Sequence, residues 1–345
     1  MRVVVANNMV PFMHGGAEEL ANHLVRRIRQ RGHEVELVRI PFRSQPYSLL
    51  PREIALAKQF TVDSADVLIP LKFPTYAIPH HHKNVWLLHQ YRQAYDLYEI
   101  GHTDIPGSLS GNAVRRMVHE SDSQAFSEAR SIYTNSPTTS GRLQHYSGFS
   151  STVLYPPLND PELFAGGPAE DYIFAGGRID ELKRQELLIQ AMAKTPSNVR
   201  LKIAGPPGSA AIAERLTELV HTLGLTDRVS LDMRFLSRQK VAQLVNGAIA
   251  CAYIPFDEDS LGYVSMEAAQ AHKPVITATD SGGILGLVKD GATGWVVPPE
   301  ASALAEALTK AVSKKRVSRA LGHAHHQHWK SFGATWNDKI DRLLE

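Results

Sequence analysis

Two cations follow a glycine pair near the middle of the chain. Gly176-Gly177 comes directly after an apolar run, Arg178 is the next residue, and Lys183 lies about one helical turn further on. A guanidinium binds phosphate as a planar fork and an ammonium binds it as a point charge, so the two residues together can neutralise a pyrophosphate. The alternative is a pair of solvated cations in a loop.

A second group of polar side chains lies in the segment that ends at Glu267. Asp259 and Ser260 close an acidic stretch, the turn Leu261-Gly262-Tyr263 begins an expected helix, and Glu267 lies roughly two turns into it. Free amides at a helix start favour anions such as phosphate, and Glu267 can accept hydrogen bonds from ribose hydroxyls. In the alternative, Asp259 or Ser260 only caps the helix and Glu267 is a surface residue.

Two further candidates lie in the first half of the chain. Gly15 and Gly16, preceded by His14, join an expected strand to an expected helix, where paired glycines let a phosphate approach the backbone. The alternative is a turn that only permits close packing of strand and helix. His89 ends another expected strand, and it is either a functional group or a histidine whose hydrogen bonds are satisfied there.

Several other chemistries are not supported. The histidine tracts at 80–82 and 323–328 have no carboxylate or cysteine set with metal-ligand spacing, so no metal site is predicted. The pattern Asp257-x-Asp259 is interpreted as part of the acidic loop, and Cys251 is predicted to pack inside a strand. With 37 Lys and Arg against 35 Asp and Glu, no nucleic-acid partner is expected.

The sequence also bears on location. No apolar run is long enough for a signal segment or a membrane span, so we expect a cytoplasmic protein. Arg26, Arg27, Arg29 and Arg31 crowd the end of the first expected helix. This cluster is either a solvated face or a contact to an anionic membrane, and the second interpretation predicts peripheral contact at the inner membrane face.

The elements that position these residues follow from an alternation of β-branched runs and amphipathic segments, which is typical of parallel sheets covered by helices. The first helix is expected at Gly16–Gln30, and a helix with one buried stripe is expected after Pro299. The expected strands are Arg2–Ala6, Glu34–Arg39, Asp66–Leu71, Val85–His89, Ser131–Asn135, Asp171–Ala175, Arg200–Ala204, Arg228–Leu231, Ala250–Ile254, Pro274–Ala278 and Gly294–Val297.

The predicted fold class is α/β, with two doubly wound, Rossmann-like domains that face each other across a cleft. Three prolines between Pro156 and Pro161 predict a linker. We therefore predict an N-terminal, acceptor-binding domain at 1–157, a C-terminal, nucleotide-sugar-binding domain at 158–325, and a helical tail at 326–345 that packs back on the first domain. Ligands are expected at the carboxyl ends of the strands, which is where the candidate residues lie.

Five sequence motifs together resemble a known family. HGGAEEL, GGRIDELKRQELLIQA, DSLGYVSMEAAQAHKPVIT, SGG and DGATGWVVPP occur in the order seen in nucleotide-sugar glycosyltransferases of the GT-B fold, retaining family four. The resemblance covers the second domain and the start of the first. In one departure, Asp259 stands where the family has glutamate. In others, Leu261-Gly262 stands where most members have Phe-Gly, and Leu285 or Gly286 where they have glutamate.

The resemblance implies a role for each candidate. Arg178 and Lys183 would bind the donor diphosphate and take part in catalysis, and Glu267 would bind the ribose. The donor sugar and phosphates would contact the segment made of Asp259, Ser260, Leu261, Gly262 and Tyr263, with Asp259 counted among the catalytic residues. Gly15 and Gly16 would contact the phosphates from the opposite domain. His89 would lie beside the donor sugar and the acceptor as a catalytic residue, with Arg92 and Asp96 holding the acceptor.

The function expected is that of a retaining, metal-independent glycosyltransferase without a cofactor. Its donor would be a nucleotide sugar, a UDP- or GDP-sugar, and its acceptor a glycan or a lipid-linked molecule in polysaccharide or glycoconjugate synthesis. Two alternatives stay open at this point. One is a GT-B sugar-nucleotide epimerase or hydrolase, and the other is a noncatalytic nucleotide-sugar-binding subunit.

Overall fold

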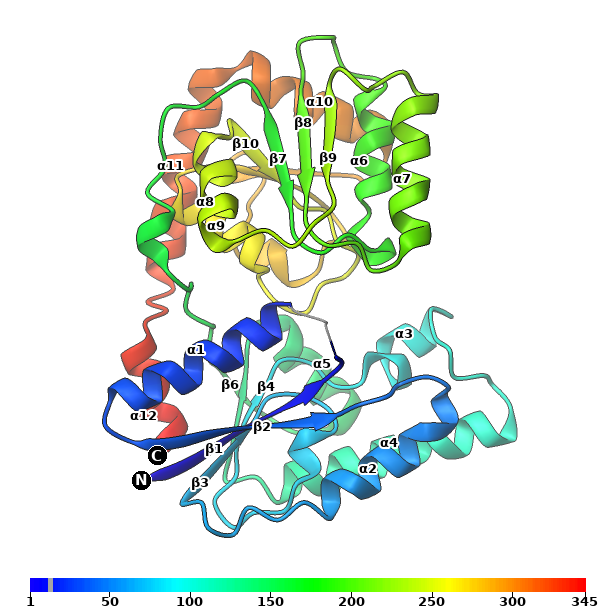
Figure 1. The fold of residues 1–345 in the computed structure, drawn as a ribbon, viewed down its shortest axis with the longest axis vertical. Coiled ribbons are helices and arrows are strands. Elements are labelled where there is room, and N and C mark those ends of the chain that lie inside the picture. Colours follow the sequence, from blue (N-terminus) through cyan, green and yellow to red (C-terminus); the bar gives the residue numbers. More distant parts are fainter. Residues whose placement is uncertain (12–14) are drawn as a thin grey trace. The chain divides into compact units, whose positions relative to one another are not determined.

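The structure is a computed structural model that describes residues 1–11 and 15–345. The chain divides into two compact units, each described by itself (Figure 1). Unit 1 comprises Met1–Pro157 together with Ala334–Glu345, and unit 2 comprises Leu158–Gly333.

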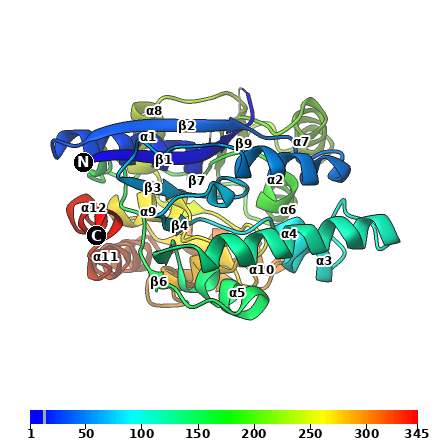
Figure 2. The same ribbon diagram turned by 90° about the horizontal axis from the view of Figure 1, so that it is seen from below.

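Unit 1 is built on parallel strands. Those in its described part are β1 (Arg2–Met9), β2 (Glu34–Pro41), β3 (Val67–Pro70), β4 (Asn84–Leu87), β5 (Ser131–Thr134) and β6 (Thr152–Val153). They form the sheets β2-β1-β3 and β4-β5-β6, and hydrogen bonds from Leu68 N to His82 O and from Leu88 N to Leu71 O join β3 to β4 (Figure 2). Every residue of β3 and β4 is buried, and apart from Asn84 these residues are apolar.

The helices of unit 1 lie between these strands, except for the last. They are α1 (Gly16–Gln30), α2 (Leu50–Lys58), α3 (Asp96–Glu99), α4 (Leu109–Ser127), α5 (Pro137–Ser147) and α12 (Trp336–Leu344). Leu20, Leu24 and Ile28 form the buried stripe of α1, at the spacing of one helix face. Ser136 caps α5, because its hydroxyl accepts a hydrogen bond from Thr139 N at 3.0 Å.

The chain's last helix returns to unit 1. Trp336, Ile340 and Leu343 of α12 are buried in the same core as α1 and β4. Trp86 packs edge-on against Trp336, and Asn84 Nδ2 donates to Leu343 O at 3.0 Å. The predicted tail began at residue 326, whereas the structure assigns residues up to Gly333 to unit 2, because 326 lies inside the continuous helix Lys315–Ser331.

Unit 2 is built on one parallel sheet. Its described strands are β7 (Ile173–Gly176), β8 (Leu201–Ala204), β9 (Val229–Asp232), β10 (Ala250–Ala252), β11 (Val275–Ala278) and β12 (Gly294–Val297). The order across the sheet is β9-β8-β7-β10-β11-β12. This is the Rossmann order, and the direction of winding reverses between β7 and β10. In an open α/β sheet the carboxyl ends of the strands at that reversal form the usual ligand crevice.

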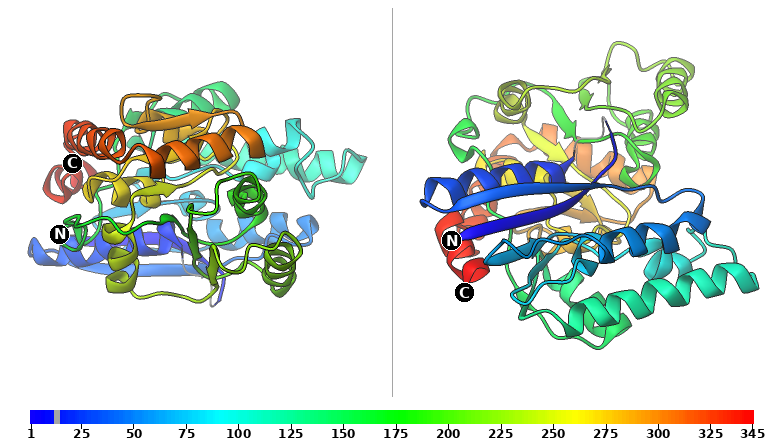
Figure 3. Two further views of the ribbon diagram at one scale, coloured as in Figure 1. Left: turned by 90° about the horizontal axis from the view of Figure 1, so that it is seen from above. Right: turned by 60° about the horizontal axis from the view of Figure 1, so that its bottom comes forward.

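Helices cover the sheet of unit 2. They are α6 (Gln185–Met192), α7 (Ala210–Thr222), α8 (Arg238–Gly247), α9 (Tyr263–Gln270), α10 (Ala301–Ser313) and α11 (Lys315–Ser331). Figure 3 shows α10 and α11, in orange and red, next to each other. Leu304, Leu308 and Val312 of α10 are buried, which confirms the stripe expected from their spacing. Cys251 is fully buried in β10, where burial raises the pKa of its thiol to about 12.

Candidate functional site

The loop after β7 lies directly against the first turn of α9. Gly177 has a φ of +106°, and a Cβ at this position would lie 3.3 Å from Val264 Cγ2. Gly205, directly after β8, is still more confined, because a Cβ there would lie 2.0 Å from Gly177 O. Glycine is therefore required at both positions, and the backbone carrying Arg178 is held at the reversal between β7 and β10.

Lys183 contacts residues that follow β10, the strand on the other side of that reversal. Its Nζ lies 3.0 Å from the hydroxyl of Tyr253, which directly follows β10, and also contacts the carboxylate of Glu258. Burial disfavours the charged ammonium, but Tyr253 and Glu258 outweigh burial and raise the pKa of Lys183. Lys183 is therefore a fixed cation, and its side chain is only 18% exposed.

Arg178 is more accessible and has a carboxylate partner of its own. Its Nε donates to Asp180 Oδ2 at 2.8 Å, and its side chain is 45% exposed. Asp180 also accepts a hydrogen bond from Lys183 N at 3.1 Å, which caps the 3₁₀ turn Glu181–Lys183. The two predicted cations thus stand on one short loop, and each already contacts an acidic side chain.

The predicted segment before α9 is tightly packed. Gly262 has a φ of +75°, and a Cβ there would lie 2.5 Å from Tyr253 Cε1. Ser260 Oγ accepts from Gly262 N at 3.2 Å, while Asp259 and Leu261 are buried. Tyr263 is half-buried and begins α9. This packing brings the first turn of α9 beside Tyr253 and hence beside Lys183.

Glu267 is the buried acid of this region. It is the fifth residue of α9, one turn into the helix rather than the two turns expected, and it is 5% exposed. Its carboxylate contacts the guanidinium of Arg238 at the start of α8. Burial raises the pKa of Glu267, and Arg238 opposes that rise. The interpretation of Glu267 as a surface residue is therefore wrong.

The glycine pair at 282–283, part of the SGG motif, packs against the acidic loop. A Cβ on Gly282 would lie 2.4 Å from Glu258 O, and one on Gly283 would lie 2.4 Å from Asp259 O. Gly283 N also donates to Glu258 O at 2.6 Å. The pair therefore packs directly against the backbone of the acidic loop, where only residues without side chains fit.

Sequence reasoning missed three residues of this region: Tyr253, Glu258 and Arg238. Glu258 was considered only as part of the acidic stretch, and the position of Tyr253 immediately after a strand was the available signal for it. Arg238 was not considered. It follows Ser237, whose hydroxyl accepts from Lys240 N and caps α8. Nothing in the local sequence connects Arg238 to Glu267.

The start of α1 in unit 1 already holds a carboxylate. Gly15 is the N-cap residue and Gly16 is the first residue of α1, whereas His14 lies outside the described residues. Burial would raise the pKa of Glu18, but Lys72, at 3.1 Å, and backbone N–H groups that include that of Gly15 outweigh burial and lower it. A phosphate at this helix start would displace Glu18.

The other candidates of unit 1 lie on the loop after β4. His89 Nδ1 is 2.7 Å from Gln90 O. Arg92 and Asp96 contact each other, with Arg92 Nε 2.8 Å from Asp96 Oδ2, and Arg142 lies 3.5 Å from the same oxygen. The structure thus brings Arg92 and Asp96 together as an ion pair with a second arginine beside it.

A buried aspartate of α4 accepts hydrogen bonds from this loop. Asp122 of α4 is fully buried, and its Oδ2 accepts hydrogen bonds from Tyr95 at 2.8 Å and from Gln90 at 3.3 Å. Burial raises the pKa of Asp122 to about 7, against the opposing effect of hydrogen bonds from Tyr95, Tyr76 and Gln90. The loop that carries His89, Arg92 and Asp96 is therefore anchored at Gln90 and Tyr95.

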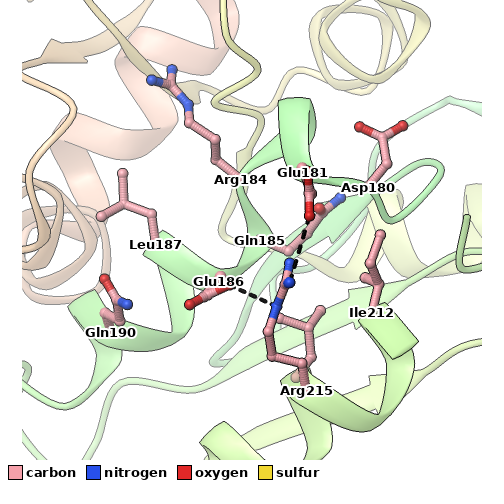
Figure 4. Close-up of a pocket in the computed structure, with 10 residues that line it drawn as sticks. Asp180, Glu181, Arg184, Gln185, Glu186, Leu187, Gln190, Ile212 and Arg215 are labelled. Atoms are coloured by element: carbon pink, nitrogen blue, oxygen red, sulfur yellow. Dashed lines mark ion pairs between the residues drawn. The ribbon is translucent and has the colours of Figure 1, made fainter. Parts of the chain in front are cut away.

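A pocket of about 400 Å³ lies on the helical face of unit 2, between α6 and α7 (Figure 4). Its central group is Arg215, which points toward Glu186 at 3.1 Å and Glu181 at 3.5 Å. Neither Arg178 nor Lys183 is among its lining residues, which are Asp180, Glu181, Arg184, Gln185, Glu186, Leu187, Gln190, Ile212, Arg215 and Leu216.

The histidine tracts serve packing. His80 Nδ1 lies 2.9 Å from His82 O, and His325 and His326 contact the carbonyls of Lys273 and Ala269, which fixes α11 against the end of α9. Within residues 1–11 and 15–345, no group of three or more His, Cys, Asp or Glu is arranged to hold a metal ion. No helix in the same residues is both long and apolar enough to cross a membrane.

The arginines at the end of α1 have partners within unit 1. Arg26 lies 2.7 Å from His23 Nδ1, and Arg27 donates to Gln30. Arg29 donates to the carbonyl of Val35, and Arg31 reaches Asp341 of α12. The first two contacts lie within α1, while those of Arg29 and Arg31 tie its end to β2 and to the last helix, so the cluster has a structural use.

The fold is that of GT-B glycosyltransferases. A sucrose-phosphate synthase from Thermosynechococcus elongatus superimposes with a TM-score of 0.78 at 18% identity, covering 99% of this chain and 97% of that one. Anabaena HepE, solved in complex with UDP and glucose, gives a TM-score of 0.74 at 18% identity and covers 100% of this chain and 99% of that one.

Residues 165–328 match the family Glycosyl transferases group 1. This match spans nearly all of unit 2. The D-inositol 3-phosphate glycosyltransferase of Mycolicibacterium smegmatis is 34% identical over 185 residues, which are 52% of this chain and 40% of the relative. The enzyme of the same name from Nocardia farcinica is 31% identical over 188 residues, again 52% and 40%. The chain thus spans less than half the length of these curated relatives.

Proposed function

We propose that the chain is a glycosyltransferase that moves a sugar from a nucleoside-diphosphate sugar, a UDP- or GDP-sugar, to an acceptor hydroxyl. The observation that carries the proposal is the position of Lys183. This fixed cation stands at the strand reversal of a Rossmann-ordered sheet, beside the first turn of α9, in a unit that matches the family Glycosyl transferases group 1.

Unit 2 would hold the donor. Arg178 and Lys183 would bind the diphosphate, and Glu267 would accept hydrogen bonds from the ribose. The backbone from Asp259 to Tyr263 would contact the donor sugar and the phosphates. Because Asp180 and Glu258 occupy the two cations in the free protein, the diphosphate would have to displace or share these carboxylates.

We propose a retaining reaction without a metal ion or other cofactor. Negative charge grows on the leaving diphosphate as the bond to the sugar breaks, and preformed cations stabilise such charge at no cost in reorganisation. Arg178 and Lys183 would supply this stabilisation. The acceptor would attack on the face that the diphosphate leaves, with the diphosphate helping to take the proton of the acceptor hydroxyl.

Unit 1 would supply the acceptor side. His89 would lie near the reacting sugar, Arg92 and Asp96 would hold the acceptor, and Gly15 and Gly16 would approach the phosphates. The acceptor would be a glycan or a lipid-linked molecule in polysaccharide or glycoconjugate synthesis, with peripheral contact to a membrane as part of that proposal. Inositol phosphate belongs in the acceptor screen, because the matched relatives are inositol 3-phosphate glycosyltransferases by name.

Thermal denaturation tests the donor class. The wild type would be heated with UDP-, GDP-, ADP- and dTDP-sugars, with and without EDTA, and the series repeated on Arg178→Ala and Glu267→Ala. A ligand at about a hundred times its Kd stabilises the native state by roughly 2.7 kcal/mol, which is readable as a shift in Tm. We expect one nucleotide to stabilise the wild type by the same amount with and without EDTA, and we expect both variants to lose this shift in Tm.

Two results would redirect the assignment. If no nucleotide sugar or free diphosphate stabilises the folded protein, the glycosyltransferase proposal loses its support. If a nucleotide sugar binds but is only hydrolysed or epimerised in every acceptor screen, a GT-B sugar-nucleotide hydrolase or epimerase is favoured. Binding without any turnover would favour a noncatalytic subunit.

A further inference from the structure

Arg238 is the first residue of α8 and contacts the buried carboxylate of Glu267, 29 residues away in sequence. The Glu267 side chain is only 6% exposed. A carboxylate in such surroundings stays ionised only when a cation or hydrogen-bond donors compensate for the lost water. Arg238 is the cation that does so here.

Arg238 is itself held on its other side by the segment that begins unit 2. Its Nη2 donates to Asn159 O at 3.0 Å, and its Nε lies 4.0 Å from Asp160 Oδ2. The guanidinium also lies 4.9 Å from the centre of the Phe164 ring. One planar group therefore bridges the chain at 159–164 and the buried acid of α9, which fixes where the Glu267 carboxylate stands.

The position of Arg238 on α8 is not explained by the helix. A cation in the first turn of a helix is unfavourable, because the amino end carries partial positive charge. Ser237 already caps α8 through Lys240 N. The arginine is thus placed against the local preference of the helix, and the interaction that compensates for this placement is the one with Glu267.

We propose that Arg238 is a positioning residue of the donor site, which keeps the Glu267 carboxylate charged and aimed so that it accepts hydrogen bonds from the nucleotide ribose. The inference rests on the proposed function, in which Glu267 binds the ribose. Arg238 acts through Glu267 and makes no contact with the phosphates or the base.

The test removes the ribose hydroxyls from the nucleotide and, separately, the Arg238 guanidinium from the protein. Calorimetric titration of the wild type with UDP, GDP and ADP identifies a ribonucleotide that binds, and its 2′,3′-dideoxy analogue is then titrated. We expect the analogue to bind at least about tenfold more weakly, as for lost hydrogen bonds to a charged group. We expect Arg238→Gln to weaken the ribonucleotide by at least about tenfold and the dideoxy analogue by less than about twofold.

Two further variants separate positioning from general structure. Arg238→Lys keeps the charge but not the bridging fork, so it should restore part of the ribonucleotide affinity. Lys240→Ala removes an exposed cation from the same turn of α8 and should leave both titrations unchanged. In the Glu267→Gln background, the additional change Arg238→Gln should cause no further loss of ribonucleotide affinity, and this doubly neutral pair also avoids an unpaired buried charge.

Each contrary result overturns the proposal. Equal weakening of the ribonucleotide and the dideoxy analogue by Arg238→Gln would show that Arg238 acts elsewhere, and so would a further loss in the Glu267→Gln background. If Arg238→Gln binds the ribonucleotide with unchanged affinity, Arg238 has no positioning role. The same follows if the wild type binds the ribonucleotide and its dideoxy analogue equally well. If the wild type binds none of UDP, GDP or ADP, the proposed function itself fails, and this inference fails with it.

Discussion

Lys183 and Tyr253 are 70 residues apart in sequence, yet the Nζ of Lys183 lies 3.0 Å from the hydroxyl of Tyr253. The first residue belongs to the loop after β7 and the second directly follows β10, so the contact spans the point where the sheet of unit 2 reverses its winding. Glu258 contacts the same ammonium. The reversal thus contains a cation that is fixed before any ligand arrives, and the properties of that cation are open to test.

Lys183→Met should weaken nucleoside-diphosphate binding by about 10- to 100-fold, because hydrogen bonds to charged groups contribute roughly 1.5–3 kcal/mol. Tyr253→Phe keeps the ammonium and its carboxylate partner, so its effect should be less than about fivefold. Calorimetric titration with the nucleotide that stabilises the wild type measures both. Lys194→Met removes an exposed lysine of the same unit and serves as the control. Unchanged affinity in Lys183→Met would show that the diphosphate does not reach this cation.

Gly262→Ala should destabilise unit 2 and weaken nucleotide binding together. The new Cβ would lie 2.5 Å from Tyr253 Cε1, at a backbone φ of +75°, so it adds a clash to the strain of the left-handed conformation. We expect a loss of about 2–4 kcal/mol in the free energy of unfolding.

Gly224→Ala is a matched control for that change. Gly224 has a φ of +64°, and a Cβ there meets no atom within 4 Å, so only the backbone strain of roughly 1–2 kcal/mol is introduced. Urea unfolding and nucleotide titration of the two variants separate strain from clash. Equal losses in both variants, with normal nucleotide affinity, would contradict the role assigned to the packing of Gly262 under Tyr253.

The elements could be predicted from the sequence where one face or both faces are buried. The bounds of α1 and β12 are those predicted, because a buried stripe or an apolar run marks them from end to end. β1 runs three residues beyond its predicted end at Ala6, because it pairs with β2 as far as Met9. That extension depends on a neighbouring strand, and the polar residues Asn7 and Asn8 hide it from any pattern of hydrophobicity.

The candidate site could be predicted as a set of loops but not as a set of partners. Arg178 and Lys183 were found because they follow a strand, and parallel strands bring their carboxyl ends to one edge of a sheet. Glu258 and Arg238 were missed, because the first reaches Lys183 across 75 residues and the second reaches Glu267 from a different helix. Such pairings are set by the order of strands, which the alternation of elements does not reveal.

The stability of unit 1 should depend on the ionisation of Asp122. Burial raises the pKa of this carboxyl to about 7 in the folded protein, whereas an aspartate in an unfolded chain has a pKa near 3.9. The folded state therefore holds the proton more tightly. The stabilisation is complete below about pH 4 and is lost as the pH rises through about 7, with a total of roughly 4 kcal/mol at 1.36 kcal/mol per unit.

Asp122→Asn should flatten this dependence, because the amide does not ionise. In urea unfolding between about pH 5 and pH 8, the free energy of unfolding of the wild type should fall across that range. That of the variant should change less, so the difference between the two should shrink at high pH. Asp63→Asn alters an exposed aspartate of the same unit and should leave the wild-type profile intact. Identical slopes in the wild type and Asp122→Asn would show that another group causes the pH dependence.

Leu343→Ala should destabilise unit 1 although it lies at the end of the chain. Leu343 is fully buried in the core that α12 shares with α1 and β4, and its carbonyl accepts a hydrogen bond from Asn84. Removing a buried leucine side chain costs about 2–5 kcal/mol. Leu344→Ala changes a half-buried neighbour and should cost clearly less. In urea unfolding, the transition of unit 1 should move to lower urea while the nucleotide affinity of unit 2 stays at the wild-type value. A parallel loss of nucleotide binding in the folded variant would show that α12 supports unit 2 as well, contrary to its assignment to unit 1.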